Sequence, residues 1–232
     1  MATYVLVHGS HHGGWCWQRV TPRLRAAGHE VYTPTLTGLG ERVHLASPEV
    51  GLSTHIQDVV NVLTFEDLTG VVLVGHSAGG RVTSGVAERV PARLAHLVYL
   101  DAPLMRDGEG GLDLYPPEAQ AVLRDRVRTQ GAGWYQPVPE SPRWGITDAA
   151  DWAWVRPRLV PQPFRATTEP ITLTGAGAGL PGTYIYCTGD KPPGSPQAAL
   201  WAPSVARARA LGYPASWRRG TTRWSPPPRD SR

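Results

Sequence analysis

The regular alternation of apolar segments with helix-forming segments is the feature that most restricts how this chain folds. Short runs rich in apolar and β-branched residues lie at 3–7, 29–33, 70–74 and 96–100, and segments with helical spacing lie at 16–27, 53–68 and 79–90. Three of the runs, at 3–7, 70–74 and 96–100, have apolar residues at consecutive positions instead of alternating with polar ones, which is typical of strands buried on both faces. The pattern predicts an α/β fold with a mostly parallel sheet and helices on both faces.

The alternation stops near residue 102. The segment 103–176 is rich in Pro, Trp and charged residues and carries only patches of helical spacing, so we expect a helical cap over the sheet. The sheet resumes with the strand-like run 183–188, and a helical segment follows at 197–211. The expected organisation is a core of 1–102 and 177–213, a cap insertion at 103–176, and a tail at 214–232 that has neither periodicity.

The formal net charge of +4 belongs to the tail. Residues 215–232 hold five arginines and one aspartate, so the remainder of the chain is neutral. This distribution argues against a basic surface for nucleic acid. We expect no membrane partner either, because the sequence has no apolar run of about 18 residues.

The cysteines and the first residues indicate the compartment. Cys16 and Cys187 are the only cysteines, which is too few for a disulfide framework. The first residues lack the basic region of a signal peptide and run directly into the apolar run 3–7. We expect a cytoplasmic protein.

The sequence GHSAG at 75–79 fits the G-x-S-x-G pattern of a nucleophile elbow. It follows a predicted buried strand and opens the predicted helix 79–90, as the elbow requires. The two glycines permit the sharp turn that presents a serine hydroxyl at the carboxyl edge of the sheet, and the helix N-terminus favours a developing oxyanion. The pattern predicts that Ser77 is a nucleophile and that His76 packs away from it; an ordinary glycine-rich turn is the alternative.

The loop after the first strand supplies the second half of such a site. Main-chain N–H groups of Ser10 and Ala78 are predicted to form the oxyanion hole. His8, His11 and His12 lie in this loop and either hold it or bind a metal. No acidic or cysteine ligand is spaced to complete a metal site, and no cofactor motif occurs, so we expect neither metal nor cofactor.

Four segments carry a resemblance to a known family: HGSHHGGWCW at 8–17, PTLTGLGERVHL at 34–45, VVLVGHSAGG at 71–80 and YIYCTGDKPPG at 184–194. Together they resemble the α/β-hydrolase superfamily, in particular the branch of plant methyl-ester esterases, hydroxynitrile lyases and bacterial esterase relatives. The resemblance covers residues 3 to about 213. It implies an α/β-hydrolase fold with an eight-stranded sheet, a helical cap, and a catalytic Ser, Asp and His in that chain order.

The resemblance assigns roles to individual residues. Ser77 matches the nucleophile, Ser10 and Ala78 the oxyanion donors, and Asp190 the acid. Asp101, which ends the run 96–100, is the alternative acid because it also lies at a carboxyl edge. The lyases usually carry a cysteine after the nucleophile and a lysine beside the histidine; their absence here favours hydrolysis of a small carboxylic ester.

The cap tryptophans are candidates for the substrate pocket. We expect Trp144 and Trp152 to line it; Trp134 and Trp154 are further candidates, and ordinary cap packing is the alternative for all of them.

The chain lacks the expected base. All eight histidines lie at or before His96, whereas the family's base lies in a GHD-type loop after the last strand. Because loss of a triad base costs on the order of 10⁶ in kcat in a serine protease, we expect impaired turnover. A catalytically inactive small-molecule-binding homologue and a hydroxynitrile-lyase-like enzyme are the alternatives.

The tail suggests a reason for this loss. With permitted codons, residues 219–228 read two nucleotides later give Gly-His-Asp-Ala-Val-Val-Thr-Ala-Pro, which resembles the missing histidine motif. We therefore hypothesise that the sequence from about residue 214 is frameshifted. This predicts a damaged last strand, a missing last helix and poor order in 215–232.

Overall fold

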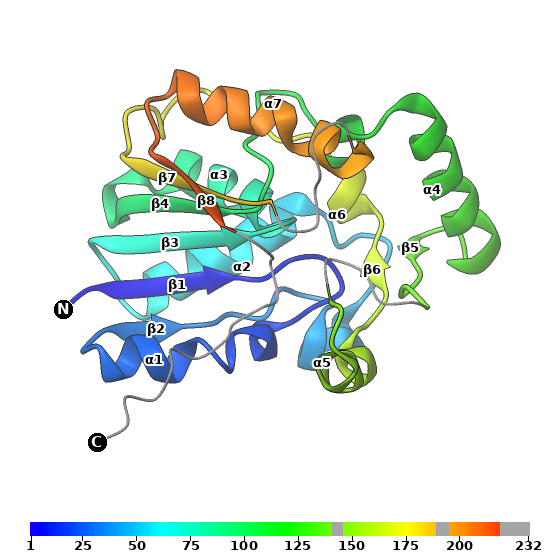
Figure 1. Ribbon diagram of the computed structural model, residues 1–232, viewed down its shortest axis with the longest axis horizontal. Coiled ribbons are helices and arrows are strands. Elements are labelled where there is room, and N and C mark those ends of the chain that lie inside the picture. The colour runs from blue at the N-terminus through cyan, green and yellow to red at the C-terminus, as the bar shows by residue number, and fades with distance from the viewer. Residues whose placement is uncertain (141–145, 189–194, 219–232) are drawn as a thin grey trace.

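The computed structural model describes residues 1–140, 146–188 and 195–218, with backbone only for 196–197 and 215–218. Within these residues the main sheet has six strands in the order β2-β1-β3-β4-β7-β8 (Figure 1). All neighbouring strands in it run parallel. The strands are β1 (Thr3–Val7), β2 (Glu30–Tyr32), β3 (Val71–His76), β4 (Leu94–Leu100), β7 (Gly182–Cys187) and β8 (Ala215–Arg218). The predicted α/β fold with a parallel sheet is confirmed.

Helices cover both faces of this sheet, as the apolar strands require. On one face α2 (Leu52–Phe65), α3 (Gly79–Arg89) and α7 (Pro196–Ala210) pack on a core that includes Val5, Val7 and Leu73. On the other face α1 (Thr21–Ala26) and the 3-10 turn η1 (Gly14–Trp17) pack on Leu6 and Val74. The helix expected at 16–27 is thus two elements, with Pro22 in the first turn of the second, where proline is well tolerated.

The helices and strands of the segment 103–176 lie beyond the carboxyl ends of the main-sheet strands (Figure 1). Its elements are η4 (Gly111–Leu114), α4 (Pro117–Gln130), β5 (Tyr135–Gln136), α5 (Ala149–Val155), η5 (Arg156–Arg158), β6 (Gln162–Pro163) and α6 (Arg165–Thr168). Strands β5 and β6 pair with each other as an antiparallel ribbon and join no other described strand. The remaining 3-10 turns are η2 (Gly40–Leu45) and η3 (Pro91–Arg93).

The strand order reverses between β1 and β3, since β2 lies on the far side of β1 and β4 on the far side of β3. Val7 at the end of β1 is in register with Gly75 near the end of β3. The loop after β1 and the turn after β3 therefore leave the sheet side by side. In open α/β sheets ligands bind at such a switch point, outside the carboxyl ends of the strands.

The described part of the main sheet has six of the eight strands that the resemblance implied. For the tail 214–232 we predicted a damaged last strand and poor order. Its residues Ala215–Arg218 form β8, which pairs with β7 from Tyr184 to Cys187. Main-chain groups on the free edge of β7 supply this pairing, and it needs no particular side chains. Residues 219–232 lie outside the described residues.

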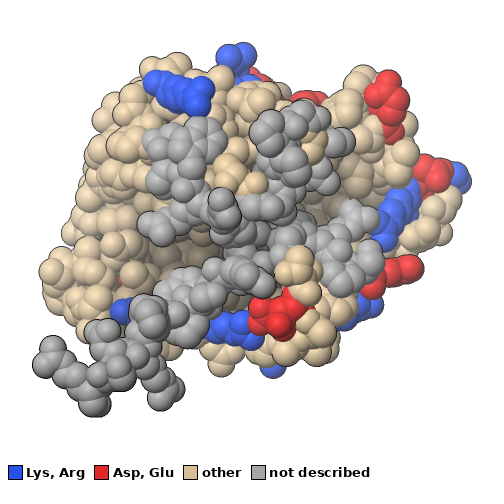
Figure 2. All heavy atoms as spheres, viewed as in Figure 1, with Lys and Arg blue, Asp and Glu red and all other residues tan. Residues whose placement is uncertain are grey.

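The surface carries charges of both signs (Figure 2). On α4, for example, Arg128 and Asp125 form an exposed ion pair of 2.6 Å. No described helix is long and apolar enough to cross a membrane. Neither Cys16 nor Cys187 forms a disulfide.

Candidate active site

Ser77 occupies the turn between β3 and α3 in a backbone conformation that is unusual for a serine. Its φ is +50°, in the left-handed region that costs an L-residue about 1–2 kcal/mol. Its N–H donates to the carbonyl of Leu100 in β4 (3.1 Å), and its carbonyl accepts from the N–H of Gly80 (2.9 Å). The surrounding main chain therefore holds the strained residue in place, which is typical of functional turns.

The glycines on either side of Ser77 are required by close backbone contacts. A Cβ atom on Gly75 would come within 2.6 Å of the Gly79 carbonyl oxygen, and one on Gly79 within 2.7 Å of the Val7 carbonyl oxygen. The G-x-S-x-G spacing is thus a packing requirement of the turn, as the pattern predicted.

The loop after β1 comes directly against this turn. A Cβ atom on Gly9 would lie 3.0 Å from the Ser77 Cβ atom. Ser10 and Ala78 line the same small cleft, so the structure brings the two candidate oxyanion donors together. Among the described residues, the Ser77 hydroxyl has no hydrogen-bond partner.

The cleft lies between this loop, the start of α2, the start of α3 and the cap. Apolar side chains from the 36–39 loop, α2 and α3 form part of its wall: Leu36, Leu39, Leu52 and Val82. Its polar lining comes from His8, Ser10, His55, Arg81 and Gln162.

His8 is a structural residue in a fixed tautomer. Its Nδ1–H donates to the Gly9 carbonyl (2.8 Å), and its Nε2 accepts from the Leu36 N–H (3.1 Å). The ring is fully buried, and burial lowers the pKa of His8 to about 3. Both nitrogens of the neutral ring are therefore occupied in holding the loops after β1 and β2.

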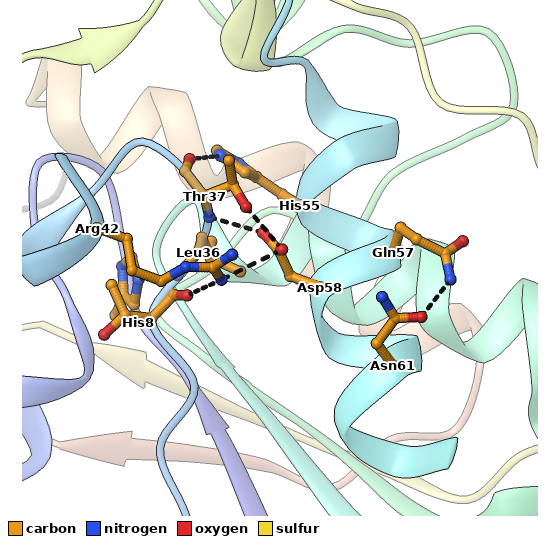
Figure 3. Close-up of polar contacts among 9 residues, drawn as sticks. His8, Leu36, Thr37, Arg42, His55, Gln57, Asp58 and Asn61 are labelled. Carbon is orange, nitrogen blue, oxygen red and sulfur yellow. Dashed lines mark hydrogen bonds and ion pairs between the residues drawn. The ribbon is translucent and has the colours of Figure 1, made fainter. Parts of the chain in front are cut away.

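His55 and Asp58 of α2 hold the same wall of the cleft (Figure 3). His55 Nε2 donates to the Thr37 carbonyl at 3.0 Å, and burial lowers the pKa of His55 to about 4. The Asp58 carboxylate accepts from the N–H of Thr37 (2.6 Å), from its hydroxyl (2.8 Å), and from Arg42 Nη1 (3.3 Å). These contacts position Leu36 and Leu39 against the cleft.

His11 and His12 bind main-chain groups of the cap and of the loop after β1. His11 Nδ1 donates to the Val160 carbonyl (3.0 Å), and the His11 N–H donates to Gln162 Oε1 (3.2 Å). His12 Nδ1 donates to the Ser10 carbonyl at 2.6 Å. The loop after β1 is thus tied to the cap, and no group of three potential metal ligands occurs in the described part of the chain.

Three further histidines, His76, His96 and His29, contact groups outside the cleft. His76 packs edge-on against Trp17 with ring centroids 6.1 Å apart, on the face of the sheet that carries α1. His96 Nε2 contacts the Thr183 hydroxyl at 2.9 Å, and His29 Nδ1 accepts from the Ala2 N–H at 3.3 Å. No described histidine forms a hydrogen bond with Ser77.

The sequence and the fold are similar to those of known hydrolases. Residues 4–225 match the alpha/beta hydrolase family. The chain belongs to this family. A carbendazim hydrolyzing esterase from Nocardioides sp. (strain SG-4G) is 40% identical over 201 residues, which cover 83% of this chain and 82% of the relative.

More distant relatives of this hydrolase match shorter segments or the fold. Methyl jasmonate esterase 1 from Vitis vinifera is 36% identical over 101 residues, covering 43% of this chain and 38% of the relative. An extracellular α/β-hydrolase from a Paenibacillus species, described as sharing structural and functional homology with tobacco salicylic acid binding protein 2, superposes with a TM-score of 0.82. It is 26% identical, and the match covers 95% of this chain and 90% of that structure.

The two candidate acids of this hydrolase differ in what the structure describes. Asp101 follows β4, is buried, and has a φ of +46°. Its carboxylate accepts from the Cys187 N–H at the end of β7 (3.2 Å), so it connects two strand ends. Asp190 lies outside the described residues.

The described cap tryptophans, Trp134, Trp152 and Trp154, are not among the residues that line the cleft. Trp152 packs in a separate apolar cluster with Ile146, Val155 and Leu159. Trp154 lies in the same cluster, beneath the guanidinium of Arg19. Trp144 lies outside the described residues.

Two polar residues of the cleft, Arg81 and Gln162, were missed at the level of sequence. Arg81 appears there only as one member of a helical run, and Gln162 as part of a proline-rich segment. The position of Arg81 one turn into the helix after the elbow is a signal that would have placed it at the carboxyl edge of the sheet.

Proposed function

We propose that this chain is a serine carboxylesterase in which Ser77 attacks the carbonyl of a small ester. The main-chain N–H groups of Ser10 and Ala78 bind the oxyanion, and an acyl-enzyme forms at Ser77. The observation that carries the proposal is the left-handed backbone at Ser77, at the β3–α3 turn and against the loop that bears Ser10. The names of the relatives, a carbendazim hydrolyzing esterase and a methyl jasmonate esterase, support a small-molecule ester as substrate.

The acid in this proposal is Asp190, with Asp101 as the alternative. The base is absent, because no histidine follows Asp190 in the sequence and the described histidines bind other groups. Turnover is therefore slow. The oxyanion hole and substrate binding alone retain on the order of 10³–10⁴ over the reaction in water, compared with a loss of about 10⁶ in kcat for a missing triad base.

The absence of a histidine after Asp190 favours a second candidate function. A hydrolase fold that keeps its cleft but lacks a base is suited to bind a small molecule without turnover. In both cases the protein acts on small molecules in the cytoplasm, without nucleic acid, membrane or cofactor. Lyase chemistry is disfavoured by Ala78 and by the missing lysine.

Hydrolysis of p-nitrophenyl acetate separates these functions. We compare the chain with Ser77→Ala and with a version in which residues from 219 onward are replaced by the sequence Gly-His-Asp-Ala-Val-Val-Thr-Ala-Pro of the shifted frame. The esterase proposal predicts weak activity that Ser77→Ala removes and the replaced tail raises by at least about 10³. Activity that persists in Ser77→Ala, or a replaced tail that stays inactive, contradicts it.

A further inference from the structure

Arg81 is a buried cation without a carboxylate partner among the described residues. It is 5% exposed and donates from Nη1 to the carbonyls of Ala166 (2.6 Å) and Thr167 (3.3 Å) in α6. Its guanidinium also lies against Gly111, where a Cβ atom would come within 2.4 Å of Nη1. No described Asp or Glu forms an ion pair with it. Burying a charge without a counter-charge is costly, so an uncompensated cation in a cleft wall points to an anion that binds there.

Gln162 adds a donor to the same wall. It is 2% exposed, and its Oε1 accepts from the His11 N–H (3.2 Å), which assigns the opposite end of the amide as the NH₂ group. Within the described residues this NH₂ group has no acceptor. The guanidinium of Arg81 and the NH₂ group of Gln162 therefore both have N–H groups left to donate to a molecule in the cleft.

No Asp or Glu is among the described residues that line the cleft. His55 is neutral near pH 7, because burial lowers its pKa to about 4, so the positive charge is that of Arg81. Leu36, Leu39 and Leu52 make part of the wall apolar, and a charge interaction is stronger in apolar surroundings than in water.

We propose that Arg81 and Gln162 form a subsite for a carboxylate, so that the substrate is an ester carrying a second, ionised carboxylate, such as a monoester of a dicarboxylic acid. The inference rests on the proposed function, since Ser10 and Ala78 of the candidate oxyanion hole line the same cleft. The ester carbonyl lies at the oxyanion hole, and the free carboxylate lies between the guanidinium and the amide. A planar guanidinium matches a carboxylate geometrically, and the amide N–H supplies a further bond.

Binding of amide analogues tests the subsite without requiring turnover. We measure by calorimetry at pH 8 the affinity of the anionic N-methylsuccinamate and of the neutral N,N′-dimethylsuccinamide. The proposal predicts that the protein prefers the anion by about tenfold or more, the range expected for a charged hydrogen bond. Equal affinities, or no detectable binding of the anion, overturn it.

Variants assign the preference to the two residues. Arg81→Met is expected to abolish it, Arg81→Lys to reduce it, and Gln162→Glu to weaken anion binding at least about tenfold while keeping the acceptor for His11. Arg93→Met is the matched control, because Arg93 also donates to main-chain carbonyls (Leu63, 3.2 Å, and Leu68, 3.0 Å) but does not line the cleft.

A preference retained in both Arg81→Lys and Gln162→Glu overturns the subsite, whatever the stability of Arg81→Met. Loss of the preference in Arg93→Met does so as well. These binding measurements do not depend on whether Ser77 reacts with an active-site probe. The subsite proposal and the esterase proposal can therefore fail separately.

Discussion

At position 77 the backbone adopts a conformation that glycine reaches freely, yet the residue is a serine. A φ of +50° there, flanked by glycines that admit no side chain, means that the turn is determined by its surroundings and that the hydroxyl is retained at a cost in stability. Such a cost is expected where a side chain has a chemical role.

Two substitutions that remove the hydroxyl separate the strain from the chemistry. We predict that Ser77→Gly unfolds with a free energy about 1 kcal/mol higher than Ser77→Ala, because only glycine relieves the left-handed backbone. Urea denaturation of both variants measures this difference. Equal stabilities, or a more stable alanine variant, would show that the residue is not strained.

The buried histidines make stability depend on pH. The pKa values of His8 and His55 are lowered by burial to about 3 and about 4, from 6.5 for an unperturbed imidazole. Below pH 6.5 these two imidazoles therefore bind protons in the unfolded chain but stay neutral in the folded chain. Their contribution is fully present above pH 6.5, and the free energy of unfolding falls as the pH decreases from about 6.5 towards about 4.

Denaturation at a series of pH values measures this slope. We expect His55→Gln to lower stability at pH 8 and to flatten the slope between pH 6.5 and 4. Replacement of the exposed His44 by Gln is the control and leaves both unchanged. A slope that is the same in His55→Gln as in the unmodified chain would be evidence against this account.

Among the elements, α2 holds one wall of the cleft in place, because its polar residues His55 and Asp58 bind the loop at Thr37. Asp58 binds three donors of the 37–42 segment, whereas Gln57 beside it faces outward and contacts Asn61 at 2.7 Å (Figure 3). Asp58 therefore holds the 37–42 segment against α2, whereas Gln57 does not contact that segment.

We predict that Asp58→Ala lowers the free energy of unfolding by about 2 kcal/mol, because it leaves the Thr37 donors without their acceptor. Gln57→Ala, the matched control, changes it by less than about 0.5 kcal/mol. Thermal denaturation gives both values. A cost for Gln57→Ala as large as that for Asp58→Ala would mean that the helix, and not the loop contact, is responsible.

The elements were largely predictable because strands and helices leave periodic patterns in side-chain type. The runs at 3–7, 70–74 and 96–100 correspond to β1, β3 and β4 within a few residues. Strand β8 was not predictable in the same way, since an edge strand held by main-chain pairing needs no apolar run. Likewise Arg81 contacts main-chain groups 85 and 86 positions further along the chain, and Gln162 contacts the main chain 151 positions before it. No local pattern in the sequence records such contacts.

In the whole molecule the two faces of the sheet are covered unequally. In β4 and β7 the side chains towards α3 and α7 are buried, including Tyr99 and Tyr184, whereas Val98, Leu100 and Ile185 on the opposite face are only partly buried. The sequence is apolar on both faces, as for strands with helices on each side. This unequal coverage is what the hypothesis of a lost terminal helix predicts.

A tail that carries the shifted-frame sequence Gly-His-Asp-Ala-Val-Val-Thr-Ala-Pro followed by an amphipathic helix is therefore expected to stabilise the protein. Burial of these side chains predicts a gain of about 3 kcal/mol in the free energy of unfolding. The control is the same tail with its apolar helix positions changed to Ser. If the two tails stabilise equally, or if neither does, the missing-helix hypothesis is wrong.

The central claim is that Ser77 is a nucleophile that lacks its base, and a fluorophosphonate probe with peptide mapping tests it most directly. We predict that the chain is labelled slowly and at Ser77, and that the tail bearing the Gly-His-Asp sequence accelerates labelling at that residue by at least about 10³. Rapid labelling of the unmodified chain, or labelling of another residue in place of Ser77, would contradict the account.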